Sequence, residues 1–365
     1  MEKKKNILGE VLDESTEVTE GTVAAEQADD LHGENLNDRV RVLSPGMMVA
    51  KRFFRSKLSI VGLVMLVALF LFSFVGPLFS PWAEGGQGVR DEINVKDTIV
   101  PVRIDYVIDG ETYYFYDITT ETPSVNNYGD MDIHHWLGTD KSGYDILTTL
   151  MLGGRISLPV GFVVVILETL IGVVLGGLAG YFGGWVDMLV MRIVDVISCI
   201  PSLPIMLILS ATLNARGILD ISRLYYLMLV LTLIGWGGLA RLVRGQILSL
   251  REQEFMLAAK CSGLSTSRKI FTPLLPNVLP QLIVSMTMGL GSIILMEATL
   301  GFLGLGAPLD TPTWGSMINT AMDPTALNKY PNFWIPPGIC ITLAILGFNF
   351  VGDGLRDAFD PKMKR

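Results

Sequence analysis

Six long apolar segments, separated by polar ones, dominate the pattern of the chain. An α-helix needs about 20 apolar residues to cross the roughly 30 Å of hydrocarbon in a bilayer. Each segment approaches or reaches that length and contains at most one charged side chain: Leu58–Phe79, Ile156–Tyr181, Val196–Leu213, Leu224–Ala240, Val278–Leu300 and Trp334–Val351. We therefore predict an all-α integral membrane protein with six transmembrane helices.

The composition of the chain supports this prediction. Of its 365 residues, 50% are hydrophobic and 18% are charged, whereas about 25% are charged in a typical soluble domain. The first apolar segment begins at Leu58, far from the position of a secretory signal peptide, so we expect this span to be retained.

Basic residues indicate the orientation, because segments rich in Lys and Arg stay on the cytoplasmic side of a membrane. Leu36–Lys57, Arg241–Leu275 and Gly352–Arg365 carry a net positive charge, whereas Ser80–Gly154 is strongly acidic. We therefore expect a multi-pass protein of the cell membrane with both termini in the cytoplasm. The short loop at Asn214–Arg223 is expected outside although it carries two arginines, because the longer segments outweigh it.

Charge and hydropathy together divide the chain into parts. The first 35 residues are acidic and poor in large apolar side chains, so burial cannot offset the entropy of ordering and we expect disorder. The predicted parts are a disordered cytoplasmic tail (1–35), a basic cytoplasmic lead-in (36–57), the first transmembrane helix (58–79), an extracytoplasmic insertion (80–154), a five-helix core (155–351) with a cytoplasmic loop at 244–276, and a cytoplasmic C-terminus (352–365).

The insertion contains a hairpin signal. The stretches "VPVRIDYVID" and "ETYYFYDI" alternate apolar and polar residues on either side of Asp109-Gly110. Asp-Gly between such runs favours a tight turn between antiparallel strands. We therefore predict a small β-rich extracellular insertion.

Glycines recur every four residues along the second apolar segment and just beyond it: Gly172, Gly176, Gly180 and Gly184. This spacing places them on one ridge of a helix. Because small residues let two helices approach closely in a bilayer, we predict a helix-packing surface. A substrate groove is the alternative.

Ionisable and helix-breaking residues also lie inside the apolar segments. Glu168 is expected either to line a translocation path or to form a hydrogen-bonded carboxyl group that faces the bundle, and Glu297 is a second possible path residue. Pro201 and Pro204 interrupt the third segment early, so we expect a kink there, either static or part of such a path.

No catalytic or metal-binding pattern is visible in the sequence. There is no GxxxxGK[ST], HExxH or GxSxG motif, and the three histidines and three cysteines lack metal-ligand spacing. "TDKSG", at Thr139–Gly143, is similar to the motif of phosphorylated-aspartate pumps but is expected outside the cell, where ATP is absent. We therefore predict that the chain is not an enzyme and binds no metal, cofactor or nucleic acid.

A polar hairpin, Glu254–Asn277, separates the fourth and fifth apolar segments. Good helix formers precede Gly263, which is expected to end a single helix in the left-handed conformation. Ser265 can then cap a second, short helix. Pro273 and Pro276 are expected to close that helix and to reset the direction of the chain.

The hairpin has a small-residue face at Ala258 and Ala259, which suits insertion into a partner's groove; a surface-lying amphipathic linker is the alternative. Its spacing resembles the cytosolic loop in transmembrane subunits of ABC importers, where EAA precedes three residues, Gly, nine residues and Ile-x-Leu-Pro. Leu257-Ala258-Ala259, Gly263 and Leu275-Pro276 fall at that spacing, with Leu257 in place of Glu and Pro273 in place of Ile.

Longer segments resemble one branch of these importers. "HHWLGTDKSGYDILTTLMLGGRISL", "EATLGFLGLGAPLDTPTWGSM", "NFVGDGLRDAFDPKMKR" and "MMVAKRFFRSKLSIVGLVML" are similar to the second, C-type permease subunit of oligopeptide/dipeptide ABC importers. The similarity covers roughly residues 45–79 and 134–365. Nickel and some glycan importers of this peptide/nickel family share the motifs.

The resemblance implies a type I ABC importer fold and a subunit that forms half of a heterodimeric pore in the lipid bilayer. The implied partners are a sister permease, two cytosolic ATPases that bind ATP and Mg, and an extracytoplasmic substrate-binding protein. The implied contacts of the coupling loop with an ATPase are Phe255, Met256, Ala258, Ala259, Gly263, Leu264, Leu275 and Pro276.

The function implied by this resemblance is ATP-driven import of oligopeptides or dipeptides, or else of nickel or a glycan. Two other classes of protein compete with it. An ion-coupled secondary transporter would favour inverted repeats and several acidic residues near the bilayer midplane, where the sequence offers Glu168 and no convincing repeat. A non-transporting membrane scaffold would have no ATPase partner.

Overall fold

The structure is a computed structural model that describes residues 45–83, 89, 91–93, 103–108, 111–116, 124–218, 222–307 and 311–359. The predicted disordered tail, residues 1–35, lies outside the described residues. The chain divides into two compact units, Met1–Lys51 and Arg52–Arg365. Of the first unit the structure describes the beginning of helix α3 (Pro45–Phe53), and the second unit is described below.

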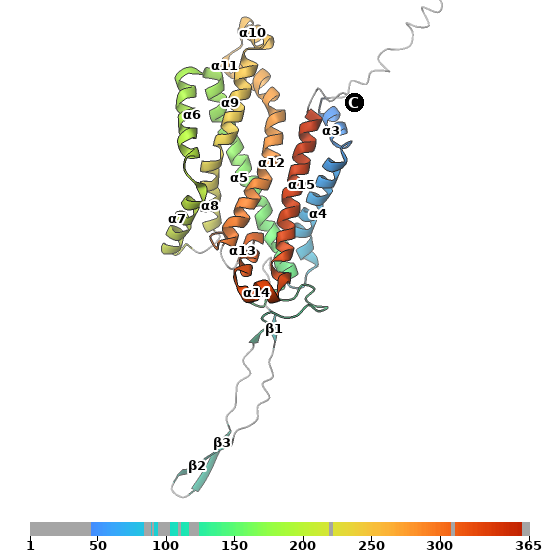
Figure 1. Ribbon diagram of the computed structural model, residues 1–365, viewed down its shortest axis with the longest axis vertical. Coiled ribbons are helices and arrows are strands. Elements are labelled where there is room, and N and C mark those ends of the chain that lie inside the picture. The colour runs from blue at the N-terminus through green and yellow to red at the C-terminus, as the bar shows by residue number, and fades with distance from the viewer. Residues whose placement is uncertain are drawn as a thin grey trace, which may run out of the picture. The chain divides into compact units, whose positions relative to one another are not determined.

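The described part of the second unit is mostly helical, as predicted. Its long helices are α4 (Lys57–Phe74), α5 (Ile146–Phe182), α6 (Gly184–Ser198), α7 (Ser202–Ala215), α8 (Ser222–Gly235), α9 (Gly237–Arg251), α12 (Leu275–Phe302) and α15 (Ile335–Phe359). Its short helices are α10 (Glu254–Cys261), α11 (Thr266–Lys269), α13 (Trp314–Asn319) and α14 (Pro324–Lys329). The long helices lie side by side, with α10 and α11 at one end and α13 and α14 at the other (Figure 1).

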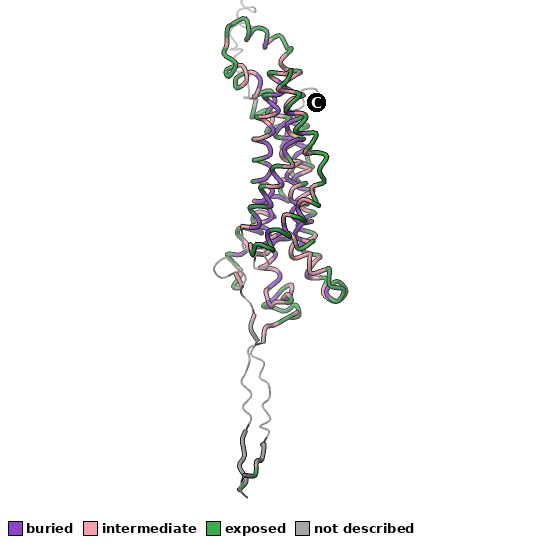
Figure 2. The backbone as a smooth tube through the Cα atoms, turned by 90° about the vertical axis from the view of Figure 1, so that its left-hand side faces the viewer, coloured by how far each residue is buried: buried purple, intermediate pink, exposed green. Residues whose placement is uncertain are grey.

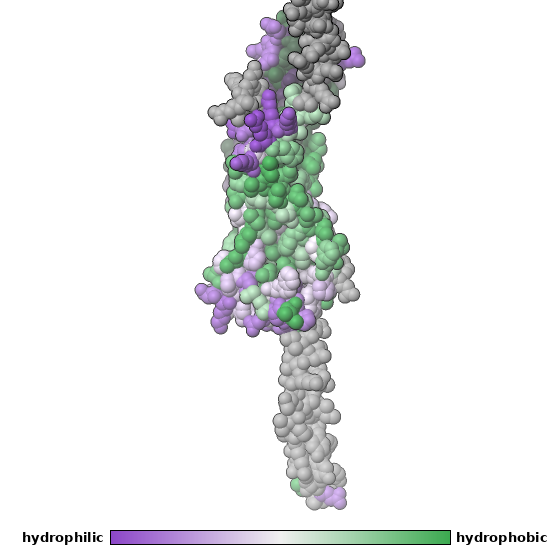
Figure 3. Space-filling model, turned by 90° about the vertical axis from the view of Figure 1, so that its right-hand side faces the viewer, coloured by the Kyte–Doolittle hydropathy of each residue, from purple (hydrophilic) through white to green (hydrophobic). Residues whose placement is uncertain are grey.

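Length and composition make five stretches in the described residues able to cross a membrane, or six if the bent pair α6–α7 is one span. On the face in Figure 3, hydrophobic side chains form a band between polar groups at the two ends of the bundle. Large apolar side chains such as Val64, Val174 and Leu229 point outward from different helices. Water would disfavour so much exposed apolar surface, whereas lipid accommodates it, and this pattern supports the prediction of a membrane protein.

Helix α5 is the centre of the bundle and packs against α4, α6, α8, α9 and α12. Trp314, at the start of α13, is fully buried in the core cluster that joins α4, α5, α12 and α15. Its indole N–H donates to the Leu150 carbonyl oxygen over 3.0 Å, and its backbone N–H donates to Ser157 Oγ over 3.2 Å. These bonds fix the segment after α12 onto α5. Buried residues recur along the bundle, whereas the α10–α11 end is mostly exposed (Figure 2).

The glycines of α5 lie against α9, the helix with which α5 shares its most extensive interface. Gly172, Gly176 and Gly180 all face the α9 backbone; a Cβ added to Gly180, for example, would lie 2.9 Å from the Arg244 carbonyl oxygen. Gly184 does not belong to this ridge, although the sequence predicted a ridge of four glycines that included it. It begins α6 with a φ of 55°, and an added Cβ there would meet nothing within 4 Å, because the chain turns away after α5.

The third predicted span, Val196–Leu213, is not one helix. The chain bends by 72° between α6 and α7, and Pro201 stands at the break with an extended backbone (φ −67°, ψ 125°). Pro204 sits in the first turn of α7, where a missing N–H removes no hydrogen bond. The expected kink is present, and it is sharp enough to divide the span.

Four short strands lie between α4 and α5. Strand β2 (Arg103–Ile108) pairs antiparallel with β3 (Glu111–Tyr116), and β1 (Glu92–Ile93) pairs with β4 (Ser124–Val125). The turn predicted at Asp109-Gly110 lies outside the described residues.

The range predicted for the insertion, residues 80–154, overlaps the start of α5. Helix α5 begins at Ile146, because the carboxylate of Asp145 accepts the backbone N–H of Thr148 and caps the helix. Residues 146–154 are therefore helical. The first transmembrane helix also differs from its predicted range, since α4 ends at Phe74 and a 3₁₀ turn follows at Gly76–Phe79.

A buried histidine ties the insertion to the start of α5. His135 Nδ1 lies 3.0 Å from Asp145 Oδ1, and its Nε2 lies 3.3 Å from Asp91 Oδ2. The Trp82 ring packs on the imidazole with centroids 4.4 Å apart. Three segments that are distant in sequence therefore meet at one end of α5.

Candidate functional site

The hairpin between α9 and α12 is built from two helices, α10 and α11, and Gly263 joins them. Gly263 has a φ of +68°. Its N–H donates to the carbonyl oxygen of Lys260, and the N–H of Leu264 donates to the carbonyl oxygen of Ala259. Ser265 Oγ accepts the N–H of Arg268 over 3.4 Å and caps α11. The left-handed glycine and the serine cap are both as predicted, because each depends on local chemistry alone.

The helix before Gly263 is broken, in contrast to the single helix that the sequence predicts. Helix α9 ends at Arg251, Gln253 is extended (φ −78°, ψ 156°), and α10 begins at Glu254. The break turns Met256 inward, where it is fully buried in a cluster with residues of α9 and α12. Burial of an apolar side chain of this size contributes about 2 kcal/mol to stability.

The prolines at the end of the hairpin do not close a helix, which corrects a second prediction. Thr266–Phe302 is a continuous helical stretch that passes through a π-helical turn at Ile270–Leu274. Pro273 lies inside this turn, whose wider spacing accommodates a ring that would clash in an α-helix. Pro276 follows this turn directly, at the second residue of α12 and inside the same helical stretch.

The residues expected to contact a partner divide into buried and exposed sets. Met256 is fully buried and Ala259 is 8% exposed, so both pack inside this chain. Phe255, Leu264 and Leu275 are half-buried, while Ala258, Gly263 and Pro276 are exposed. The small-residue face of the sequence therefore reduces to Ala258, because α10 turns Ala259 toward the core.

Two large apolar side chains of the hairpin are also exposed. Leu257 is 63% exposed and Phe271 is 65% exposed. Leu257 was noted in the sequence as a departure from the importer pattern, whereas Phe271 was not singled out. The exposed surface formed by Leu257, Ala258 and Phe271 is called the hairpin face below.

Arginines of α9 fasten the base of the hairpin. Arg244 forms two hydrogen bonds with Asp187 of α6, over 2.7 and 2.6 Å, and Arg251 donates to the carbonyl oxygen of Tyr181 at the end of α5. Asp195 of α6 lies 4.0 Å from Arg192 of the same helix and 3.0 Å from Arg241 of α9. The hairpin therefore extends from a helix that is bonded to both α5 and α6.

Glu168 is a residue of α5, and its side chain lies inside the bundle beside Gly235, the last residue of α8. Its side chain is buried, and Oε1 has no hydrogen-bond partner among the described residues. Gly235 provides the space that the carboxyl group occupies, since an added Cβ at Gly235 would overlap Oε1. Any larger residue at that position would displace the carboxyl group.

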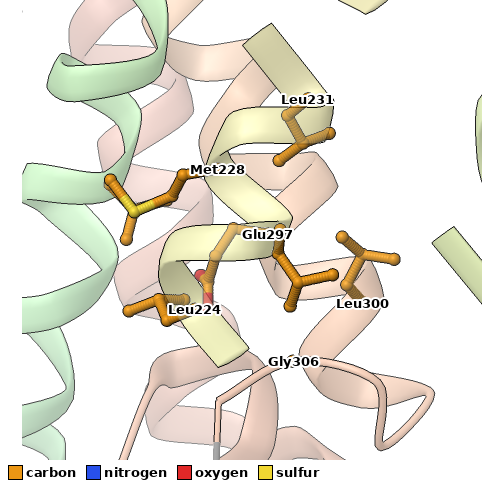
Figure 4. Close-up of a pocket in the computed structure, with 8 residues that line it drawn as sticks. Leu224, Met228, Leu231, Glu297, Leu300 and Gly306 are labelled. Carbon is orange, nitrogen blue, oxygen red and sulfur yellow. The ribbon is translucent and has the colours of Figure 1, made fainter. Parts of the chain in front are cut away.

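Glu297 is 4% exposed and borders a small cavity of about 10 Å³ between α5, α8 and α12, about the space of one water molecule. Its carboxyl group lies behind α8 between Met228 and Leu224 (Figure 4). Ser157 and Thr313 are the nearby polar side chains, but within the described part of the chain neither carboxyl oxygen of Glu297 accepts a hydrogen bond. Glu168 and Glu297 thus come from different helices and both face α8.

Arg223 is a buried cation whose structural role the sequence did not reveal. Nη1 donates to Asn214 Oδ1 over 3.1 Å, and Nη2 donates to Ser210 Oγ over 2.5 Å and to the Gly304 carbonyl oxygen over 3.2 Å. These bonds join α7, α8 and the segment after α12. An arginine in a loop expected outside the cell is explained by this internal network.

No group of three His, Cys, Asp or Glu side chains in the described ranges is arranged to hold a metal ion. The features that the structure does present are a bundle of apolar helices, two buried carboxyl groups, and a hairpin with exposed apolar side chains at one end. These features define a multi-pass membrane protein.

Comparison with known proteins gives the family. Residues 172–365 match the family described as binding-protein-dependent transport system inner membrane component, and residues 44–94 match the N-terminal TM domain of oligopeptide transport permease C. The chain belongs to this family of inner membrane transport components.

Named relatives cover most of the chain. A dipeptide transport system permease protein (DppC) of Alkalihalophilus pseudofirmus is 35% identical over 327 residues, which span 90% of this chain and 93% of the relative. An oligopeptide transport system permease protein (OppC) of Bacillus subtilis is 36% identical over 316 residues, 86% of this chain and 88% of the relative. OppC of Haemophilus influenzae is 33% identical over 86% of this chain.

Proposed function

We propose that this chain is a transmembrane, pore-forming subunit of an ATP-driven importer that moves oligopeptides or dipeptides into the cell. The observation that carries the proposal is the match to permeases of peptide transport along nearly the whole chain. Nickel and glycan importers of the same family are not favoured, because the named relatives above are permeases of peptide transport.

The orientation follows from charge and from the arrangement of the helices. Six spans, with α6–α7 counted as one, place both termini in the cytoplasm. The α10–α11 hairpin and the C-terminal end of α15 lie at the same end of the bundle (Figure 1), and this end carries the basic residues that favour the cytoplasmic side. The insertion between α4 and α5, with its β2–β3 hairpin, faces outward.

The partners are those of a binding-protein-dependent importer. A sister permease forms the other half of the pore, an extracytoplasmic protein delivers the cargo, and two cytosolic ATPases bind ATP and Mg. This chain supplies the hairpin face, Leu257, Ala258 and Phe271, as the contact with one ATPase. Exposed apolar side chains flanking a small residue suit insertion into a groove.

The internal packing of the hairpin explains how force reaches the spans. Met256 joins α10 to α9 and α12, Arg244 joins α9 to α6, and the glycines of α5 hold α9 without space between the backbones. Closure of the ATPases therefore displaces the hairpin together with α9, α5 and α12. Glu168 and Glu297 both lie next to α8, and they contribute polar groups to the path along which the cargo crosses the membrane.

The test replaces Ala258 with tryptophan. Because Ala258 is exposed, Ala258→Trp leaves the fold intact but fills the space where the ATPase docks; overpacking costs about 1–3 kcal/mol. We expect loss of labelled dipeptide uptake and of ATPase co-purification, with unchanged amounts of the protein in the membrane. Ala211→Trp is the matched control, since Ala211 is an exposed helical alanine of α7, away from the hairpin.

Full uptake by the Ala258→Trp complex, with its ATPases still bound, would refute the role given to the hairpin face. Uptake of nickel but of no peptide by the wild-type complex would refute the proposed cargo. Ala259→Trp is a less informative variant, because Ala259 is buried and its replacement also disrupts the packing of α10.

A further inference from the structure

A second cavity is lined by residues of α13, α14 and the segments next to them, and α13 and α14 lie at the opposite end of the bundle from the hairpin (Figure 1). Its volume is about 280 Å³, close to the lower limit for sites that hold small ligands. Two stretches far apart in sequence line this half-open cavity, and the lining residues are Tyr128, Lys141, Asn319, Thr320, Met322, Asp323, Ala326 and Phe333.

One wall of the cavity is aromatic: Tyr128 and Phe333 line it, and Tyr330 packs against both rings. Tyr128 lies 4.7 Å from Tyr330 and 5.5 Å from Phe333, measured between ring centroids, with interplanar angles of 18° and 24°. Tyr330 and Phe333 are also stacked, at 5.4 Å. Aromatic rings bind apolar groups and attract cations.

Tyr128 is held in this wall against its conformational preference. Its φ of 58° is left-handed, an uncommon value for a bulky side chain. The turn is locked by Thr139, whose Oγ1 donates to the Asn126 carbonyl oxygen over 2.5 Å and accepts the N–H of Gly129 over 2.8 Å. Such strain costs about 1–3 kcal/mol and is concentrated at functional sites.

The "TDKSG" turn contributes the ammonium side chain of Lys141 to the lining of the same cavity. Asp140 Oδ1 accepts the backbone N–H groups of Ser142 and Tyr144, over 2.7 and 2.9 Å, so the turn is rigid. Lys141 at its tip is exposed and forms no ion pair within the described residues. This motif has no part in the transport mechanism given above.

A carboxylate side chain, that of Asp323, lines the cavity as well. Asp323 Oδ1 accepts the N–H of Thr325 over 2.8 Å, and Asp323 has no ion-pair partner in the part of the chain that the structure describes. Burial raises the pKa of the Tyr128 hydroxyl, and the Asp323 carboxylate raises it further. The tyrosine therefore stays a neutral hydrogen-bond donor beside the carboxylate.

We propose that this cavity binds a short free peptide by its two charged termini, with the ammonium group at Asp323 and the aromatic wall and the carboxylate at Lys141. Separate, unpaired charges of opposite sign match a zwitterion, and the ring faces match the apolar parts of a peptide. The inference rests on the proposed function, since it assigns a cargo-binding site to the outer end of the permease itself.

The test measures binding of the dipeptide Ala-Phe to the complex of this chain with its sister permease and ATPases in nanodiscs, without the extracytoplasmic binding protein. Lys141→Gln and Asp323→Asn are each expected to weaken binding about tenfold or more, because each removes a charge-assisted hydrogen bond. Lys329→Gln is the matched control: Lys329 is exposed on α14 but does not line the cavity.

Blocked peptides then identify which residue reads which terminus. N-acetyl-Ala-Phe should bind weakly, and Asp323→Asn should weaken it no further, whereas Lys141→Gln still should. Ala-Phe-amide should show the reverse dependence. Lys141→Arg, which keeps the charge, should retain binding of the free dipeptide and so exclude a purely structural effect.

The absence of Ala-Phe binding to the wild-type complex, equal binding by all variants, or indifference to both blocking groups would overturn the proposal. A parallel uptake assay, with the binding protein present, separates this failure from that of the proposed function. Peptide uptake without peptide binding at the cavity overturns only the present inference. No peptide uptake by the complete wild-type system overturns the proposed function.

Discussion

Replacement of Gly176 with alanine is expected to strain the contact between α5 and α9. An added Cβ at Gly176 would lie 2.9 Å from the Cα and 3.0 Å from the carbonyl carbon of Ala240, and it would overlap the carbonyl oxygen. These are backbone atoms in the middle of a helix, so they cannot rotate away. The two helices must separate, and they lose dispersion contacts along their whole interface.

The magnitude of the destabilisation by Gly176→Ala follows from a comparison with Gly245→Ala. Gly245 is an exposed position of α9, and an added Cβ there would meet nothing within 4 Å. Both substitutions change the helix propensity by the same amount, up to about 1 kcal/mol in favour of alanine. The difference between the two variants therefore isolates the overpacking, which is expected to cost about 1–3 kcal/mol.

The assay is unfolding of the purified chain in mixed micelles at increasing fractions of dodecyl sulfate. Trp236 reports on the region, because it is buried in a cluster with Ala240 and Val194. We expect Gly176→Ala to unfold at a lower fraction than wild type, and Gly245→Ala at an equal or higher one. Coincident midpoints for the two alanine variants would refute the tight α5–α9 contact.

Three further outcomes follow from the geometry of the chain. Gly263→Ala places a Cβ on a left-handed residue, which costs about 1–2 kcal/mol, so amide hydrogen exchange in α10 and α11 should accelerate. Gly235→Ala should destabilise the protein by displacing the carboxyl group of Glu168, and its effect should largely vanish in the Glu168→Ala background, with a coupling energy of about 1 kcal/mol or more. In variants that keep one cysteine each, exposed Cys261 should react with a membrane-impermeant maleimide in inverted vesicles but not in intact cells, and buried Cys340 should react only after unfolding.

Each of these outcomes has a clear counter-result. Unchanged exchange in Gly263→Ala would show that the hairpin does not require the left-handed turn. Additive effects of the Gly235 and Glu168 substitutions would place the carboxyl group elsewhere. Labelling of Cys261 from outside intact cells would invert the orientation and remove the basis for ATPase docking.

Local chemistry was enough to predict some features. The apolar segments were visible in the sequence because a bilayer demands long uncharged helices. The turn at Gly263 and the cap at Ser265 were predictable because each depends on one residue's own backbone preference or side-chain reach. A kink at Pro201 was predictable for the same reason.

Other features depended on contacts between distant segments. Neither the 72° bend after α6 nor the helical path through Pro273 follows from the presence of a proline, because both depend on what the flanking helices pack against. Ala258 and Ala259 are adjacent and identical in type. Burial of Met256 against α9 and α12 decides which of the two faces outward.

The sequence by itself determined that the chain is a helical membrane protein with basic segments, an acidic segment between its first two long helices and a hairpin with a left-handed glycine at its turn. Only the tertiary structure decided which side chains of the hairpin are free and that Glu168 and Glu297 both face α8. It also brought Tyr128, Lys141 and Asp323 around one cavity. The physical reason is that hydropathy and backbone preference act on neighbours in sequence, whereas exposure and charge pairing are set by residues that folding brings together.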